Sequence, residues 1–88
     1  MSDEGLERLR EQVTANDRAI VEAVNRRLEL VAEIKRYKAE HGIEFLDPDR
    51  EAWMLDDLRR TNDGGPLSDE GLERLFQELL DLSKRETR

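Results

Sequence analysis

Two basic residues fall on the apolar face of a long predicted helix, where aliphatic side chains are expected. Between residues 6 and 41 the chain has no glycine or proline, and its apolar residues recur at helical spacing. The apolar stripe consists of Leu6, Leu9, Val13, Ile20, Val24 and Val31. At about 100° per residue, Arg27 and Lys38 lie roughly 40° and 20° from the centre of this stripe. Two cations on a face that should be buried need a partner, and a bound anion is the most economical one.

Other polar residues on or beside the inner faces of the predicted helices complete a candidate site. They are Arg10 at the edge of the first stripe, Asp47, Arg50 and Glu51 at the start of a second helix, and Ser83 and Thr87 on a third. A guanidinium binds a carboxylate through two parallel hydrogen bonds, and a lysine acts as a compact positive charge. Acidic side chains accept hydrogen bonds from hydroxyl or amine groups. This combination predicts a small polar ligand with at least two carboxylates and one hydrogen-bonding substituent.

The same charges have a second interpretation that requires no ligand. Charged residues of long helices usually face solvent or form internal ion pairs, such as Arg27 with Glu51. His41 is expected at the end of a helix, and a single histidine does not indicate a metal site. Ser83 has no evident histidine to act as its base, so nucleophilic catalysis is not indicated.

Three helices are expected to position these residues. Ser2 and Asp3 offer an N-cap for the first helix, Gly42 is typical of a helix C-terminus, Asp47-Pro48 of a helix start, and Ser68 of an N-cap. The predicted helices run from about Leu6 to His41, from Pro48 to about Thr61, and from Ser68 onward. Because prolines are few and residues that favour helices dominate, we expect an all-α fold with a single helical domain over residues 1–88.

The length of the first helix and the charge of the chain limit the classes of function. A helix of about 38 residues is about 57 Å long, which exceeds the diameter of a globule of this size. We therefore expect it to pack against a second copy, in an intertwined helical homodimer. The formal charge of −7 argues against binding to nucleic-acid phosphates. No apolar run approaches the roughly 20 residues of a membrane span and no signal peptide precedes the first helix, so a cytoplasmic protein is expected.

The order and spacing of these residues resemble the AroQ-class, all-helical chorismate mutase domain. The similar segments are Leu9-Arg10-Glu11, Asp17, Arg26–Leu30, Lys35–Lys38, Asp47–Glu51, Leu75–Gln77 and Ser83. Each segment alone is common, but the ordered set covers essentially the whole chain. The resemblance implies an intertwined homodimer with two active sites, each using residues of both chains. It also implies an isomerase that converts chorismate into prephenate and needs neither a metal nor a cofactor.

The resemblance further implies a role for each candidate residue. The partner's Arg10 and the same chain's Arg27 would bind substrate carboxylates, and Lys38 would contact the ether oxygen and a carboxylate. Asp47 and Glu51 would contact the C4 hydroxyl of the ring. Arg50 would support the charge network, and Ser83 would bind the ring carboxylate. Because negative charge builds on the ether oxygen as the C–O bond breaks, Lys38 is the expected catalytic donor.

Thr87 departs from the family pattern, which usually has a glutamine, sometimes a glutamate, as a second donor to the ether oxygen. Threonine is shorter, and loss of such a donor can cost about 10²–10³ in rate. We therefore expect an enzyme that is slow alone, that binds a modified substrate, or that needs a partner to close the site. An aromatic-pathway synthase is the partner expected by analogy with some small actinobacterial-type members.

Several alternatives stay open at this point. Related reactions on this scaffold are the rearrangement of 4-amino-4-deoxychorismate, whose ammonium suits Asp47 and Glu51, and the elimination of pyruvate from isochorismate. The first would place the enzyme in an antibiotic or other secondary pathway. Outside enzymes, the alternatives are a non-catalytic helical dimer that scaffolds a partner, and a plain antiparallel coiled coil.

Overall fold

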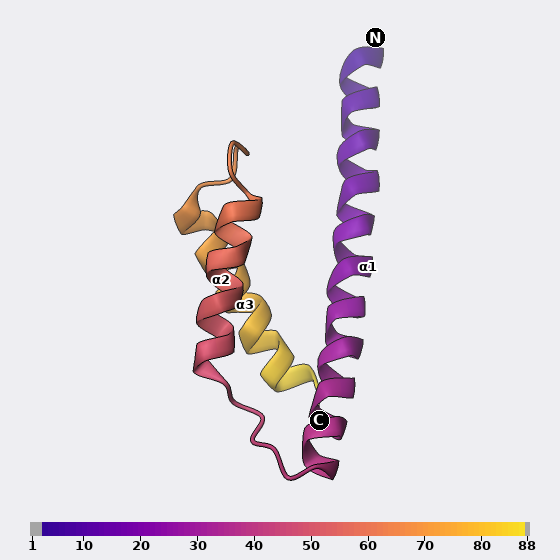
Figure 1. The fold of residues 1–88 in the computed structure, drawn as a ribbon. Helices are drawn as coiled ribbons and strands as arrows, with labels where there is room; N and C mark the ends of the chain where they lie inside the picture. Colours follow the sequence, from indigo (N-terminus) through magenta and orange to yellow (C-terminus); the bar gives the residue numbers. More distant parts are fainter. Residues whose placement is uncertain (1–2, 88) are drawn as a thin grey trace.

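The chain forms three helices over residues 3–87, which are the residues that the computed structural model describes (Figure 1). Helix α1 spans Glu4–Glu40, α2 spans Pro48–Thr61 and α3 spans Asp69–Glu86. The predicted all-α fold with one long N-terminal helix is confirmed. Ser2, one of two residues expected to cap the first helix, lies outside the described residues.

A side chain caps the first turn of each helix. Each capping side chain accepts a hydrogen bond from a backbone N–H three residues later. Asp3 accepts from Leu6 at 3.1 Å, Asp47 from Arg50 at 3.1 Å, and Ser68 from Gly71 at 3.0 Å. These bonds satisfy N–H groups that have no partner inside the helix. Beyond α1, Gly42 has a φ of 64°, a left-handed conformation that glycine adopts without steric cost. This turn directs the chain back toward α2.

The helices converge at one end of an elongated molecule. Its principal extents are 62 × 26 × 17 Å, and α3 contacts both α1 and α2. Figure 1 shows α2 and α3 packed together, with the C-terminal end of α3 reaching the C-terminal half of α1. The N-terminal half of α1 projects away from them. The residues expected to form a site are therefore brought together only where the C-terminal half of α1 approaches the other two helices.

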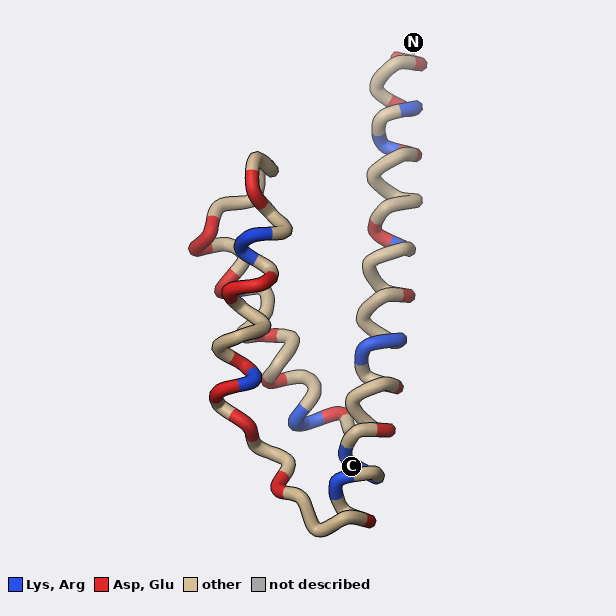
Figure 2. The backbone as a smooth tube through the Cα atoms, viewed as in Figure 1, with Lys and Arg blue, Asp and Glu red and all other residues tan. Residues whose placement is uncertain are grey.

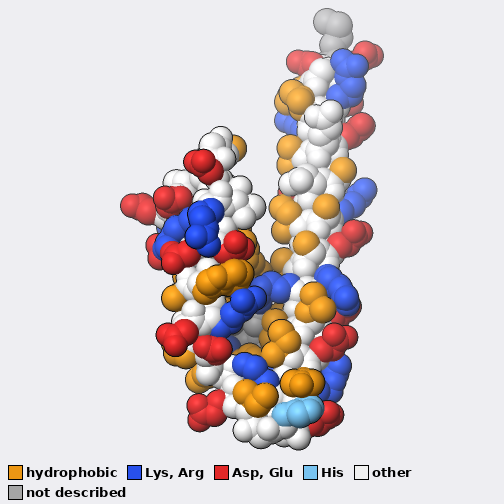
Figure 3. Space-filling view, viewed as in Figure 1, with side chains coloured by type: hydrophobic (Ala, Val, Ile, Leu, Met, Phe, Trp, Pro, Cys, Tyr) orange, Lys and Arg blue, Asp and Glu red, His pale blue; other side chains and the backbone are white. Residues whose placement is uncertain are grey.

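Little apolar surface is buried within one chain. Leu72 and Leu80 of α3 are the buried apolar side chains of residues 3–87, and no residue of α1 is buried. Leu9 and Leu75, both on predicted inner faces, are 60% and 49% exposed. Figure 3 shows hydrophobic side chains along the projecting half of α1. A helix with such an exposed stripe requires apolar surface from elsewhere to cover it.

No helix within the described part of the chain combines the length and the apolar character needed to cross a lipid bilayer.

Candidate active site

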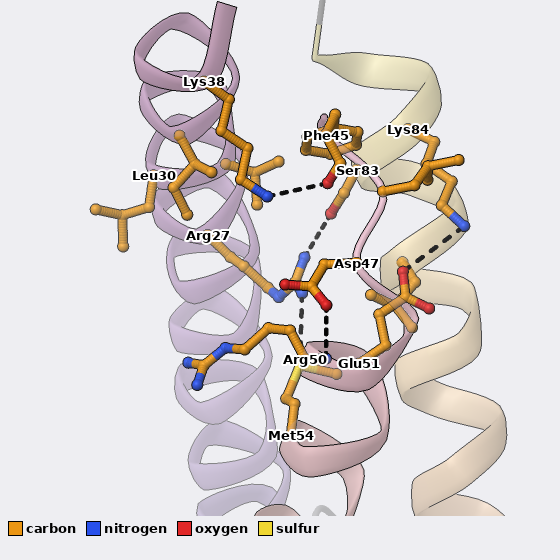
Figure 4. Close-up of a pocket in the computed structure, with 14 residues that line it drawn as sticks. Arg27, Leu30, Lys38, Phe45, Asp47, Arg50, Glu51, Met54, Ser83 and Lys84 are labelled. Atoms are coloured by element: carbon orange, nitrogen blue, oxygen red, sulfur yellow. Dashed lines mark hydrogen bonds and ion pairs between the residues drawn. The ribbon is translucent and has the colours of Figure 1, made fainter. Parts of the chain in front are cut away.

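A cavity of about 290 Å³ lies between α1, the link before α2, the first turns of α2 and the end of α3 (Figure 4). Its polar and charged lining consists of Arg27, Lys38, Asp47, Arg50, Glu51, Ser83 and Lys84. Its apolar lining consists of Leu30, Val31, Ile34, Phe45, Leu46, Met54 and Leu80. Six of the eight predicted site residues therefore meet in one cavity, with an aliphatic and aromatic wall beside them.

Helical geometry places the two cations of α1 on the same side of the cavity. Arg27 and Lys38 are eleven residues apart, which is close to three full turns and about 16 Å along the axis. Both side chains are partly buried and point toward α3 and the link (Figure 4). The positions that looked anomalous in the apolar stripe are thus the positions that face the cavity.

Ser83 holds the guanidinium of Arg27 in place. Arg27 Nη1 donates to Ser83 Oγ, and Ser83 Oγ donates in turn to the Leu79 carbonyl at 2.8 Å. Ser83 is only 3% exposed, and Arg27 Nη2 also lies 3.9 Å from Met54 Sδ. Because the hydroxyl hydrogen is used by Leu79, the oxygen is left to accept from the cation. The guanidinium is therefore positioned before any ligand arrives.

The link before α2 fixes the ammonium of Lys38. Lys38 Nζ donates to the Phe45 carbonyl at 3.1 Å and lies 5.7 Å from the centre of the Phe45 ring. An ammonium has three N–H donors, and this contact occupies one of them. The remaining donors are available to a ligand in the cavity.

The start of α2 supplies both carboxylates. Asp47 caps α2 through the Arg50 N–H, so its side chain is held by the helix terminus that it stabilises. Glu51 Oε1 lies 3.9 Å from Lys84 Nζ of α3. The Arg27–Glu51 ion pair of the ligand-free interpretation is not formed among the described residues, because Arg27 is bonded to Ser83 instead. The Arg50 guanidinium stacks on the Trp53 ring at 4.3 Å from its centre.

Two predicted site residues lie outside the cavity lining. Arg10 is exposed on the projecting half of α1. It lies seventeen positions before Arg27, which corresponds to about 25 Å along the helix axis. Thr87 is 5% exposed, and its hydroxyl donates to the Ser83 carbonyl. The spacing of four residues from Ser83 predicted one shared face, but α3 ends at Glu86 and Thr87 is an extended C-cap with φ −109° and ψ 117°. Its side chain therefore folds back on the last turn.

The amino-acid sequence matches the family of chorismate mutase type II over residues 9–88. The chain belongs to this family. The family resemblance inferred from residue order is thereby confirmed, while the roles of individual site residues stay predictions.

Solved structures and curated proteins agree with this assignment. The structure of chorismate mutase (form I) from Thermus thermophilus is 36% identical, with a TM-score of 0.83 over 91% of this chain and 99% of that chain. Form II from the same organism has a TM-score of 0.81 over 97% and 100% of the two chains. The 4-amino-4-deoxychorismate mutase of Streptomyces venezuelae is 34% identical over 71 residues, which are 81% of this chain and 64% of that protein. The T-protein of Enterobacter agglomerans is 40% identical over 52 residues, 59% of this chain and 14% of that protein. The chain thus spans less than two thirds of the length of these two curated relatives.

Sequence reasoning missed two lysines that line or adjoin this cavity. Lys84 lines the cavity beside Ser83, and nothing in the sequence pattern singled it out. Lys35 donates to the Thr87 carbonyl and lies 4.7 Å from the centre of the Phe45 ring. Through these two contacts, Lys35 connects α1 to the end of α3 and to the link before α2. Only its position one turn before Lys38, on a neighbouring part of the helix surface, pointed to it.

Proposed function

We propose that this chain catalyses the rearrangement of chorismate to prephenate. The observation that carries the proposal is one cavity in which Arg27 and Lys38, both fixed by hydrogen bonds, face the carboxylates of Asp47 and Glu51. Chorismate has two carboxylates and an ether oxygen that suit the two cations, and one hydroxyl that suits the acidic side chains. Membership of the type II family supports the same reaction.

The proposed roles follow from charge and reach. Arg27, positioned by Ser83, binds one carboxylate. Lys38 contacts the ether oxygen and a carboxylate, and Asp47 with Glu51 accepts from the C4 hydroxyl. Arg50 supports this network from its stacked position on Trp53. The reaction is a concerted rearrangement in which the C–O ether bond breaks while a C–C bond forms, so no proton needs to be transferred. The site accelerates it by holding the reactive conformation and by stabilising negative charge on the ether oxygen.

We also propose that two chains form an intertwined homodimer, with Arg10 of one chain completing the site of the other. Two observations support this: the apolar stripe of the projecting half of α1 is exposed in one chain, and Arg10 lies on that half, far from its own chain's cavity. The second site would be completed in the same way because a two-fold dimer repeats each contact. A cytoplasmic location is proposed with it, since a doubly charged substrate does not cross a membrane unaided.

The deciding experiment mixes purified protein with chorismate and follows the loss of the diene absorbance of the substrate. We expect acceleration over the uncatalysed reaction and formation of prephenate. If the protein has no effect, either alone or with an added aromatic-pathway synthase, the proposal is wrong and a scaffolding role becomes the better interpretation.

A second candidate substrate is 4-amino-4-deoxychorismate. The relative from Streptomyces venezuelae that bears this substrate in its name supports it, as does the presence of two carboxylates at the start of α2. Comparing kcat/KM for the two substrates on the same protein separates the candidates. Isochorismate belongs in the same panel, with release of pyruvate as its readout.

Thr87→Gln is expected to raise kcat/KM for chorismate by about tenfold or more, because the longer side chain can carry an amide donor from the C-cap of α3 into the cavity, which Thr87 does not line. Thr87→Met is the matched control, since it has a similar length and no donor. Steady-state kinetics of both variants test the prediction. An equal gain in both variants would assign the effect to packing, and no gain in either would show that this position does not limit the rate.

A further inference from the structure

Lys84 lines the cavity, but none of the proposed contacts uses it. The side chain extends from the last turns of α3 toward α2, where its Nζ lies 3.9 Å from Glu51 Oε1 (Figure 4). The two side chains are 42% and 38% exposed, so the pair sits at the mouth of the cavity. A single ion pair of this exposure contributes little to folding stability. Because Glu51 is a proposed substrate-binding carboxylate, its pairing with Lys84 can affect which substrate the site prefers.

The cavity carries an excess of positive charge in a chain whose formal charge is −7. Its basic lining residues are Arg27, Lys38, Arg50 and Lys84, against the acidic Asp47 and Glu51. Figure 2 shows that Lys and Arg residues occur both on the C-terminal half of α1 and near the end of α3. Such a local field suits a dianion better than a ligand in which an added ammonium cancels one negative charge.

We propose that Lys84 is a specificity-determining residue that favours a hydroxyl over an ammonium at C4 of the substrate. This inference rests on the proposed function. A carboxylate has two oxygens with several lone pairs, so Glu51 can accept from a neutral hydroxyl while it stays paired with Lys84. An ammonium at the same place would lie beside a like charge and would compete with Lys84 for Glu51. The pair therefore discriminates against 4-amino-4-deoxychorismate without touching the reacting bonds.

The effect is electrostatic and of moderate size. Two unit charges a few ångströms apart at a partly exposed site interact strongly enough to change a rate ratio by about fivefold. Because the pair is accessible to solvent, added salt should weaken the discrimination. A purely structural role of Lys84 would lower the rates of both substrates together and would not respond to salt in this way.

The experiment compares kcat/KM for chorismate and 4-amino-4-deoxychorismate in the wild-type protein and three variants. Lys84→Met removes the charge but keeps a long side chain with good helix propensity. Lys84→Arg keeps the charge. Arg85→Met is the matched control, because it removes one positive charge from the next residue of α3, which does not line this cavity. Thermal unfolding of each variant checks that the fold is retained.

We expect the ratio of kcat/KM for the amino substrate to kcat/KM for the hydroxyl substrate to rise about fivefold in Lys84→Met, and to stay at the wild-type value in Lys84→Arg and Arg85→Met. The difference between wild type and Lys84→Met should shrink at high ionic strength. An unchanged ratio in Lys84→Met, with a wild-type protein active on chorismate, would overturn the inference alone. An equal rise in Arg85→Met would also overturn it, because net charge would then be the cause. A wild-type protein that accelerates neither substrate would overturn the proposed function and this inference together.

Discussion

Lys38→Ala is expected to lower kcat/KM for chorismate by about 10²–10³-fold, the loss typical of a donor that stabilises developing negative charge. The Phe45 carbonyl holds Lys38 Nζ at 3.1 Å, which fixes the ammonium while leaving other N–H donors to face the cavity. The charge is therefore in place before the C–O bond lengthens, and little reorganisation is needed as the transition state forms. Steady-state kinetics with chorismate measure the loss.

Arg36→Ala is the matched control for this variant. Arg36 carries the same charge, lies on the same helix and is exposed outside the cavity lining. We expect it to keep a rate close to that of the wild-type protein. Far-ultraviolet circular dichroism and thermal unfolding of both variants should show an intact helical fold. A Lys38→Ala protein with full activity would mean that another group donates to the ether oxygen, and Lys84 would be the first residue to test in that role.

Local signals were sufficient to predict the helices of this chain. These signals act over only a few residues. Asp47 and Ser68 cap the starts of α2 and α3, and Gly42 adopts a left-handed conformation after the end of α1. Helical periodicity also placed Arg27 and Lys38 on one face, because angular position around a helix depends only on residue spacing. The structure confirms that both face the same cavity.

Partners across helices were harder to predict, because periodicity does not fix how one helix is rotated or shifted against another. Glu51 was considered as a partner of Arg27, but the structure pairs Arg27 with Ser83 and Glu51 with Lys84. Thr87 illustrates a second limit. A spacing of four residues implies a shared face only while the helix continues, and α3 ends one residue earlier. The roles of Arg10 and of a second chain lie beyond any single chain and stay predictions.

Those two predictions can be tested together by mixing two inactive variants. If the site of one chain uses its own Lys38 and the partner's Arg10, Arg10→Ala and Lys38→Ala homodimers each lack a working site. In a mixed dimer, the chain with an intact Lys38 receives an intact Arg10 from the other chain, so one of the two sites of the dimer is complete. The other site lacks both residues. Random assembly of equal amounts makes about half of the dimers mixed, and activity should return to about one quarter of the wild-type value.

Subunit exchange requires that the two proteins be unfolded and refolded together, and sedimentation equilibrium should give twice the chain mass before and after mixing. Arg27→Ala mixed with Lys38→Ala is the control. Arg27 and Lys38 line the same chain's cavity, so every site of that mixed dimer lacks one of them and no activity should return. Recovery in the first mixture alone requires that Arg10 act across the dimer. Recovery in neither mixture, or equal recovery in both, would exclude the shared site and would leave the projecting half of α1 as a packing element only.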